Sequence, residues 1–434
     1  MEQGRARNMK GLTGWAALLL LVAVTAWLSW TLQAPITLQG GYGWDGVEYG
    51  RVAAQLAAGD RPRAEAPYLY RLGAPALAGR LSPADPLAGF RLVNGAASLL
   101  APLLLYFWLG GFGLRPLTRW LGATLFVLQW HAPLRLTPFY PAHADPLMWV
   151  LWLLGLLLLQ CSRNGVGPGL LAAWCGWILL AVPCREVLLL PALALLFTTD
   201  SLLLERRPWL VWRARLAERL RPVLLLPLTL GLLVFLLIHA WAVPTNHYGF
   251  LKTAVLWLWL KSPGQYLLGL CLALGPAVLV LLLLDARRAW SFLKERQELG
   301  LLAVTVPALG WIGGSDTERL LFWGAPLALL LAGRGLDAWL DSLRRRSLGA
   351  LAFLAFLAAS QALAQRLCWT IPDYPGTTER VWPLLTPLSS HGPYLDLWSS
   401  HGDPKVLIVA FAQYLLVIGM GLWWGSKGRS SCQS

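Results

Sequence analysis

The stretch GGYGWDGVEYGRVAAQL, from Gly40 to Leu56, places two carboxylates three positions apart, at Asp45 and Glu48. If a helix begins at Gly46, Asp45 immediately precedes it and Glu48 lies one turn further along. A carboxylate in such a place can act as a general base. Asp is also common at a helix start, so an N-cap beside interfacial aromatic side chains is the alternative interpretation. We take Asp45 and Glu48 as the candidate catalytic pair.

Two further stretches could bind a polar or anionic group. In PYLYRLGAPAL, Tyr70 and Arg71 precede an apolar run, and a guanidinium can bind a phosphate through two hydrogen bonds. An arginine that contacts ordinary lipid headgroups is the plainer alternative. In FYPAHADPLMW, His143 titrates near neutral pH beside Asp145, although Asp followed by Pro146 is also a typical helix start. We take all four side chains as candidate substrate-binding residues.

A later stretch, GGSDTERLLFW, combines helix-start residues with a cation. Ser315 and Glu318 match a capping box, and the dipole of the following helix favours Asp316 as well. Arg319 is different, because a cation in the first turn opposes the helix dipole and needs an anionic partner such as Asp316 or a ligand. Asp316 and Arg319 complete the set of candidate binding residues.

The elements that position these residues are membrane helices. Of the 434 residues, 57% are hydrophobic and 13% are charged, whereas soluble domains carry about 25% charged residues. Apolar segments of about 20 residues, enough to cross a bilayer, recur along the chain. The fold class is therefore an all-α polytopic membrane protein with about twelve transmembrane helices, in a range of about ten to thirteen. The expected spans are 11–33, 88–110, 117–131, 145–161, 168–182, 186–200, 222–242, 265–284, 299–314, 318–337, 348–368 and 405–425.

The basic residues predict the orientation of these spans. With the N-terminus in the cytoplasm, most Lys and Arg residues fall in inner connectors, as the positive-inside rule requires. The net charge of +14 therefore reflects topology and not nucleic-acid binding. One inner stretch, 205–221, interleaves Arg with Leu and Trp, which is typical of an amphipathic helix on an anionic leaflet.

The predicted topology gives one transmembrane domain, 1–434, with two long outer loops. The first, 34–87, carries the candidate catalytic motif and a short interfacial helix; the last, 369–404, is expected to act as a lid. All candidate site residues fall at the outer membrane boundary, where polar groups are costly unless they line a shared cavity. Such a cleft would suit a substrate with a polar head and an apolar tail.

Four motifs resemble those of the GT-C class of membrane glycosyltransferases, which includes the GPI-type mannosyltransferases and their bacterial relatives. They are WDGVEY from Trp44, YRLGAPAL from Tyr70, PFYPAHADPLMWVLWLLGLLLL from Pro138 and SDTERLLFWGAP from Ser315. The resemblance implies transfer of a sugar from a polyprenyl-phosphate donor to a lipid, glycan or protein acceptor. It also implies a site on the outer face of a membrane that we expect to be the bacterial inner (cytoplasmic) membrane, within the cell envelope.

By this resemblance, Asp45 is the candidate base, and Glu48, His143 and Asp145 line the same site. Arg71 or Arg319 would hold the phosphate of the donor. Many members of the class have two acids one residue apart, whereas the pair here is D-x-x-E. A divalent cation, Mg or Mn, therefore stays an open expectation.

Two other classes of function fit parts of the sequence. About twelve helices is common in secondary transporters and lipid flippases, but the two halves of the chain show no repeat, and the ionisable residues gather at one face instead of the midplane. A non-catalytic membrane assembly protein is the second alternative, in which the polar residues only cap helices. Membrane lipids are contacts in every case.

Overall fold

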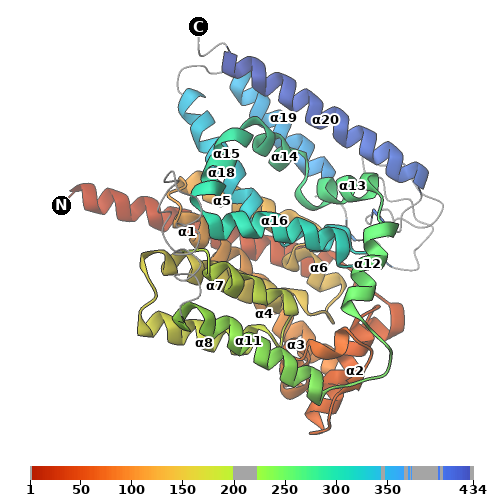
Figure 1. Cartoon of the computed structure of the whole chain (residues 1–434). Coiled ribbons are helices and arrows are strands. Elements are labelled where there is room, and N and C mark those ends of the chain that lie inside the picture. Colours follow the sequence, from red (N-terminus) through yellow and green to blue (C-terminus); the bar gives the residue numbers. More distant parts are fainter. Residues whose placement is uncertain are drawn as a thin grey trace.

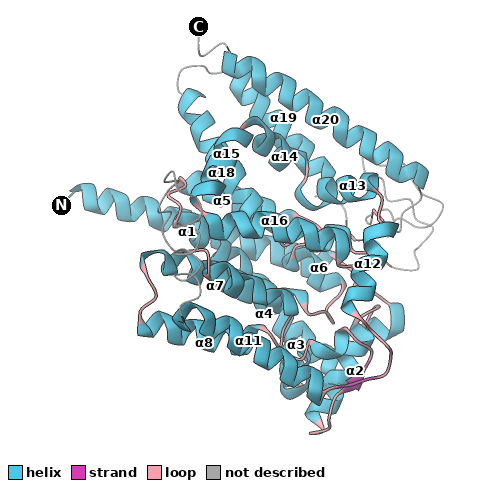
Figure 2. Cartoon of the chain, in the orientation of Figure 1, coloured by secondary structure: helices cyan, strands magenta, loops and turns pink. Residues whose placement is uncertain are grey.

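The computed structural model describes residues 2–198, 222–343, 348–365, 370–371, 373, 399–400 and 404–430. Within these residues the chain is a bundle of helices, with two very short strands beside α2 (Figures 1 and 2). The amphipathic stretch predicted at 205–221 lies outside the described residues. So does the lid predicted at 369–404, apart from the few positions given above.

In the first half of the chain, two short helices, α2 and α3, come between two long ones, α1 and α4. Proline occupies the first turn of many helices, where its missing N–H costs no hydrogen bond. The helices up to residue 198 are α1 (Glu2–Leu32), α2 (Gly46–Ala57), α3 (Gly73–Leu81), α4 (Pro86–Gly110), α5 (Pro116–Leu128), α6 (Pro133–Phe139), α7 (Asp145–Cys161), α8 (Pro168–Ala181) and α9 (Leu189–Leu195), with 3-10 helices η1 (Leu38–Gly41), η2 (Tyr68–Tyr70), η3 (Ser162–Asn164) and η4 (Glu186–Leu188).

The second half ends with α19 and α20 lying side by side at the edge of the bundle (Figure 1). The two strands are β1 (Arg63–Ala64) and β2 (Val243–Pro244), which pair in parallel. The remaining helices are α11 (Pro222–Trp241), α12 (Phe250–Leu260), α13 (Pro263–Leu274), α14 (Pro276–Leu284), α15 (Ala286–Glu295), α16 (Gln297–Ile312), α17 (Thr317–Phe322), α18 (Ala325–Leu343), α19 (Leu348–Ala364) and α20 (Pro404–Ser430).

The helices confirm an all-α membrane protein, but not the predicted number of crossings. In the described part of the chain, five helices are long and apolar enough to span a bilayer, and a sixth span arises if one bent pair is counted. Four of them lie within α1, α4, α11 and α20, and the fifth consists of α7 together with η3. Several other predicted spans correspond to shorter apolar helices, such as α8 and α16. The count of about twelve therefore stays a prediction.

The predicted span 265–284 is not straight. It consists of α13 and α14, which meet at an angle of 100°. Gly275 adopts a φ of +77° between them, and Pro276 starts the second helix. The side chain of Gln361 accepts a hydrogen bond from the Ala277 N–H (2.9 Å) and donates one to the Leu274 carbonyl (3.0 Å). Gln361 thus satisfies the backbone groups that the break exposes, as apolar surroundings require.

The first outer loop is folded against the bundle. The predicted helix after Asp45 is confirmed, since α2 begins at Gly46. β1 joins the loop to the segment after α11, and the carboxamide of Asn246 both accepts a hydrogen bond from the Ala66 N–H and donates one to the Ala66 carbonyl. The loop therefore holds a defined position relative to the helix ends that it covers.

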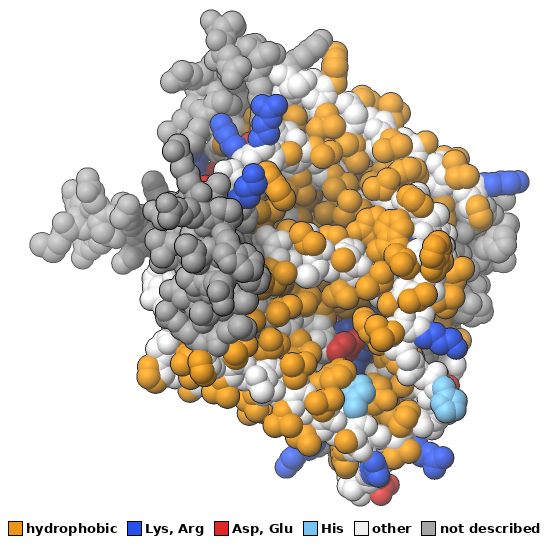
Figure 3. All heavy atoms as spheres, in the orientation of Figure 1, with side chains coloured by type: hydrophobic (Ala, Val, Ile, Leu, Met, Phe, Trp, Pro, Cys, Tyr) orange, Lys and Arg blue, Asp and Glu red, His pale blue; other side chains and the backbone are white. Residues whose placement is uncertain are grey.

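The surface agrees with a lipid environment. Large apolar side chains are exposed on several helices, including Leu236 on α11, Trp259 on α12 and Ile408 on α20. The face in Figure 3 is mostly apolar, with charged side chains near its margins and at one spot within it. In water such a surface would be costly, whereas lipid chains can cover it.

Candidate active site

The candidate site forms where the starts of α2, α7 and α17 meet. Asp45 occupies the N-cap position of α2, but its side chain makes no capping hydrogen bond. One carboxylate oxygen instead lies 3.6 Å from the Nη2 atom of Arg319. The capping interpretation of Asp45 is therefore wrong for its side chain, which faces a cation from a distant part of the sequence.

Arg319 has three carboxylates around its guanidinium. Its Nη2 atom lies 2.5 Å from an oxygen of Asp316, and its Nε atom lies 3.6 Å from an oxygen of Asp145. Asp45 is the third. The expectation that Arg319 needs the anionic partner Asp316 is confirmed. Because the side chain of Arg319 is only 13% exposed, water screens these charges poorly and their attraction is strong.

Asp145 is held by a second arginine. It is the first residue of α7, yet its carboxylate pairs with Arg185 and not with the helix backbone. The guanidinium of Arg185 lies 4.9 Å from the ring centre of Trp323, which gives it a cation–π contact as well. The predicted helix start at Asp145 is confirmed, but capping does not explain its side chain, which joins α7 to the turn before α9.

Arg71 lies in a neighbouring ion pair. Its Nη2 atom is 2.8 Å from an oxygen of Glu186, and its Nη1 atom donates to the Tyr49 hydroxyl at 3.0 Å. The nearby carboxylate of Glu186 raises the pKa of Arg71 against the opposing effect of burial, so Arg71 stays charged. Arg185 and Glu186 are adjacent in the sequence, yet each pairs with a residue from an earlier segment.

His143 is buried beside this cluster without a hydrogen-bond partner. It is 2% exposed, and neither ring nitrogen bonds to any residue that the structure describes. The ring stacks on Tyr140, with 5.2 Å between ring centres. Burial, together with the charges of Arg319 and Arg185, lowers the pKa of His143 well below its usual range. A neutral imidazole therefore offers one donor and one acceptor to a ligand.

The connector that carries His143 is held rigidly. The side-chain amide of Asn94, on α4, donates to the carbonyls of Pro141 and His143, both at 2.7 Å. The Tyr140 hydroxyl accepts a hydrogen bond from the Gly46 N–H at 2.8 Å, at the start of α2. The first outer loop and the connector that carries His143 are thus joined by a hydrogen bond one residue away from Asp45.

Glycine at position 46 allows this close approach. A Cβ atom there would lie 2.7 Å from the Ala142 carbonyl oxygen and 2.9 Å from the Ala142 Cβ. Contacts under 3.0 Å force the surrounding atoms to move. The glycine after Asp45 therefore has a packing reason, independent of any helix-start preference.

Two predicted site residues contact other partners. The Glu48 carboxylate binds Arg51 at 2.8 Å and accepts a hydrogen bond from the Glu65 N–H at 2.8 Å. Tyr70 stacks on His239, with 3.6 Å between ring centres. The structure thus places both side chains in the first outer loop near the site, but in contacts that hold the loop together. Their roles in catalysis and binding stay predictions.

The capping box predicted at Ser315 is not formed. Glu318 accepts a hydrogen bond from the Ser399 N–H, and the Ser315 hydroxyl donates to Asp316 at 3.3 Å. The Ser400 hydroxyl donates to the Ser315 carbonyl at 2.6 Å. The described end of the last outer loop therefore lies against the start of α17.

The sequence alone does not identify several residues that hold the candidate site together. Tyr49, Tyr140, Asn94 and the partner choices of Arg185 and Glu186 depend on segments far apart in the chain. For Tyr49 and Tyr140 the available signal is that each stands within five residues of a candidate acid. Asn94 also has a sequence signal, since a side-chain amide inside an apolar helix needs a hydrogen-bond partner.

The acids of the site do not form a metal-ligand set in this structure. Among the residues described, no group of three or more His, Cys, Asp or Glu side chains is arranged to hold a metal ion. Asp45, Asp145 and Asp316 each face the guanidinium of Arg319 instead.

Comparisons with known proteins give a distant structural match. No family model matches the chain, and no curated protein sequence matches it. The chain is similar to the crystal structure of ArnT from Cupriavidus metallidurans in the apo state, with a TM-score of 0.45 and 17% sequence identity. The match covers 96% of this chain and 78% of that one.

Proposed function

We propose that the chain is a membrane glycosyltransferase that moves a sugar from a polyprenyl-phosphate donor to an acceptor at the outer face of the membrane. The observation that carries this proposal is the meeting of Asp45 with Arg319 beside the unpaired ring of His143. A candidate base, a cation for a phosphate and a neutral hydrogen-bonding group stand together at the end of a lipid-facing bundle. Glycosyl transfer from a lipid phosphate needs each of these.

The proposed reaction is a displacement at the anomeric carbon. The acceptor hydroxyl gives its proton to Asp45, and its oxygen forms a bond to the anomeric carbon. The bond between that carbon and the phosphate oxygen breaks, and the lipid phosphate leaves with the electron pair. Arg319 stabilises the charge that develops on the phosphate. Its contact with Asp45, at 3.6 Å, is long enough for a phosphate oxygen to replace it and free the base.

The other candidates support this reaction. His143 and Asp145 contact the sugar or the phosphate beside Arg319, and Asp316 keeps Arg319 in place. Arg71 supplies a second positive charge. Glu48 and Tyr70 act in this scheme as positioning residues, since their contacts hold the first outer loop. The acceptor is a lipid, glycan or protein, and a divalent cation such as Mg or Mn remains part of the hypothesis to be tested.

The proposed topology has about twelve crossings, with both termini in the cytoplasm of a bacterium and the site outside. Contacts support this arrangement, because residues assigned to the same side meet each other. Arg115 lies 3.9 Å from Asp337, and Arg163 lies 4.0 Å from Glu298, all assigned to inner connectors or the ends of spans beside them. The outer set meets around Arg319 instead.

Sugar transfer in the purified protein tests the proposal. We expect Asp45→Asn to lower the rate from a polyprenyl-phosphate sugar by at least about 100-fold, the scale of a lost general base. Asp60→Asn, on an exposed side chain of the same loop, is the matched control and should retain the rate. Undiminished transfer by a folded Asp45→Asn protein would refute the assignment. Substrate flux into proteoliposomes without a covalent product would identify a transporter instead.

A further inference from the structure

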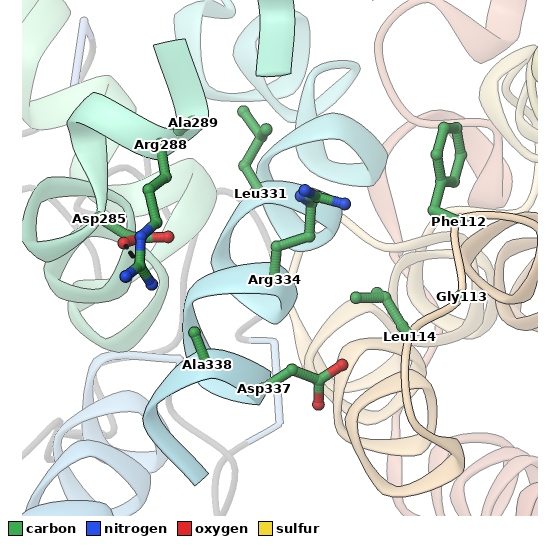
Figure 4. A pocket seen from close by; sticks show the side chains of 10 residues that line it. All are labelled: Phe112, Gly113, Leu114, Asp285, Arg288, Ala289, Leu331, Arg334, Asp337 and Ala338. Atoms are coloured by element: carbon green, nitrogen blue, oxygen red, sulfur yellow. Dashed lines mark ion pairs between the residues drawn. The ribbon is translucent and has the colours of Figure 1, made fainter. Parts of the chain in front are cut away.

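A polar cavity lies away from the Asp45 cluster. It has a volume of about 270 Å³ and opens between the connector after α4, the start of α15 and the middle of α18 (Figure 4). Four charged side chains line it, together with apolar ones. The charged residues are Asp285, Arg288, Arg334 and Asp337.

This cavity is at the opposite end of the bundle from the candidate active site. Asn94 contacts the connector that carries His143, and α4 then continues to Gly110 just before the cavity residue Phe112. About 16 residues of helix separate Asn94 from Gly110, or about 24 Å at 1.5 Å per residue. The two sites are therefore at opposite membrane faces, and a ligand of one cannot touch the other.

The two acids of the cavity already have cationic or donor partners. Asp337 accepts hydrogen bonds from the Arg115 N–H, at 3.0 Å, and from the Thr118 hydroxyl, both at the start of α5. Asp285 is 6% exposed and lies 3.8 Å from Arg288. Both carboxylates are therefore held by partners within the bundle.

Of the charged residues that line the cavity, Arg334 forms no ion pair with any residue that the structure describes. Its guanidinium lies 4.2 Å from the ring centre of Phe292. In Figure 4 it extends from α18 towards the connector that carries Phe112. Arg288, whose side chain is 72% exposed, reaches the same cavity from α15. Arg334 and Arg288 thus both line the cavity, from α18 and from α15.

The helix beside the cavity indicates where its mouth opens. α15 buries Phe292 against the bundle and exposes Arg287, Arg288 and Lys294. Trp290 is 59% exposed on this helix. An exposed Trp beside basic residues is typical of a helix that lies in the headgroup layer of a membrane.

We propose that this cavity binds the phosphate headgroup of an anionic lipid from the leaflet opposite the Asp45 cluster. The phosphate lies between Arg334 and Arg288, which donate charge-assisted hydrogen bonds. The apolar surface beside Trp290 accommodates the start of the acyl chains. Basic pockets between helices on the cytoplasmic side suit such headgroups. This site is independent of the catalytic assignment, because it uses none of the same residues.

Lipid binding by the full chain in mixed micelles tests the proposal. The probes are phosphatidylglycerol, net-neutral phosphatidylcholine and inorganic phosphate, and the readouts are the unfolding midpoint and the lipid retained in native mass spectra. Phosphatidylglycerol should raise the midpoint, whereas the other two probes should not. Arg334→Gln and the double variant Arg288→Gln/Arg334→Gln should weaken phosphatidylglycerol binding at least about 10-fold, the scale of one charge-assisted contact.

Two further variants make the result specific. Arg287→Gln removes an adjacent exposed charge that does not line the cavity and should bind as the unmodified chain does. Arg334→Lys keeps the charge but loses the planar donor pair, so it should bind with intermediate affinity and also show that the site still folds. Equal retention of phosphatidylglycerol by the Gln variants would overturn the proposal. Equal stabilisation by inorganic phosphate alone would overturn the lipid assignment and indicate a soluble anion.

Discussion

The guanidinium of Arg319 lies 3.6 Å from the carboxylate of Asp45, which joins the start of α17 to the start of α2. The two residues lie far apart in the sequence; Asp45 alone resembles an ordinary helix-start residue, whereas Arg319 is a cation in the first turn of a helix. Their contact brings the proposed base next to the proposed phosphate-binding cation.

Arg319→Ala should destabilise the protein by about 3 kcal/mol, because it leaves three carboxylates near one another without their shared cation. Arg319→Lys should lie between this variant and the unmodified chain. Chemical unfolding in detergent gives the comparison. Arg91→Ala, at an exposed position on α4, is the control. A loss for Arg319→Ala no larger than for Arg91→Ala would contradict the importance of the ion cluster.

Tyr140→Phe removes the hydroxyl that accepts the Gly46 N–H. A buried donor left unpaired costs about 1 to 3 kcal/mol, and the start of α2 gains freedom next to Asp45. We expect a lower unfolding midpoint and a reduced kcat with little change in KM. Tyr248→Phe, on a side chain that is 37% exposed, should change neither quantity. If both variants behave alike, the hydrogen bond does not position Asp45.

Gly46→Ala should lower the stability by about 1 to 3 kcal/mol, because the new Cβ meets the Ala142 carbonyl. The displacement of α2 should reduce sugar transfer more than the lost stability explains. Gly176→Ala, within α8, is the matched change, since its Cβ would meet nothing within 4 Å. It should stabilise the helix by about 0.5 to 1 kcal/mol. Normal transfer by Gly46→Ala would show that the close approach has no functional role.

Acid should weaken the folded protein through His143. The folded chain keeps this ring neutral because its pKa is lowered, whereas the unfolded chain takes up a proton below about pH 6.5. Each pH unit below that value therefore costs up to about 1.4 kcal/mol, until the folded pKa is reached. Between about pH 7.5 and about pH 5, the free energy of unfolding should fall less for His143→Asn than for the unmodified chain.

The same titration of His247→Asn is the control for this effect. His247 is exposed in the segment after β2, so its substitution should leave the acid slope of the unfolding midpoint unchanged. A His143→Asn slope identical to that of His247→Asn would mean that His143 can take up a proton in the folded state.

The local pattern of the sequence predicts the helix starts and the membrane character well, because both depend on neighbouring residues. The helix after Asp45, the beginning of α7 at Asp145 and the anionic partner of Arg319 all follow from local rules. The meeting of Asp45, Asp145 and Arg319 agrees with the shared outer boundary that the spacing of apolar runs predicts for them. These features supply the frame of the site.

What local pattern cannot predict is which side chains pair across the bundle. Asp145 has the sequence of a helix start, yet its carboxylate binds Arg185, because tertiary packing brings a stronger partner than the backbone N–H groups. Glu48 resembles Asp45 in sequence but faces Arg51 and the Glu65 N–H. The break at Gly275 is similar, because the carboxamide that satisfies its backbone groups belongs to Gln361, on α19. The sequence around Gly275 alone does not indicate this partner.

The pairing of Asp45 with Arg319 also affects how the protein is made. A ribosome delivers the chain from its N-terminus, so Asp45 reaches the membrane long before Arg319 has been synthesised. During that interval Asp45 lacks the cation that faces it in the finished protein. Only when the segment around α17 is inserted can the acid and the cation neutralise each other. The ion cluster around Arg319 is therefore completed late in biogenesis, after most of the chain has been synthesised.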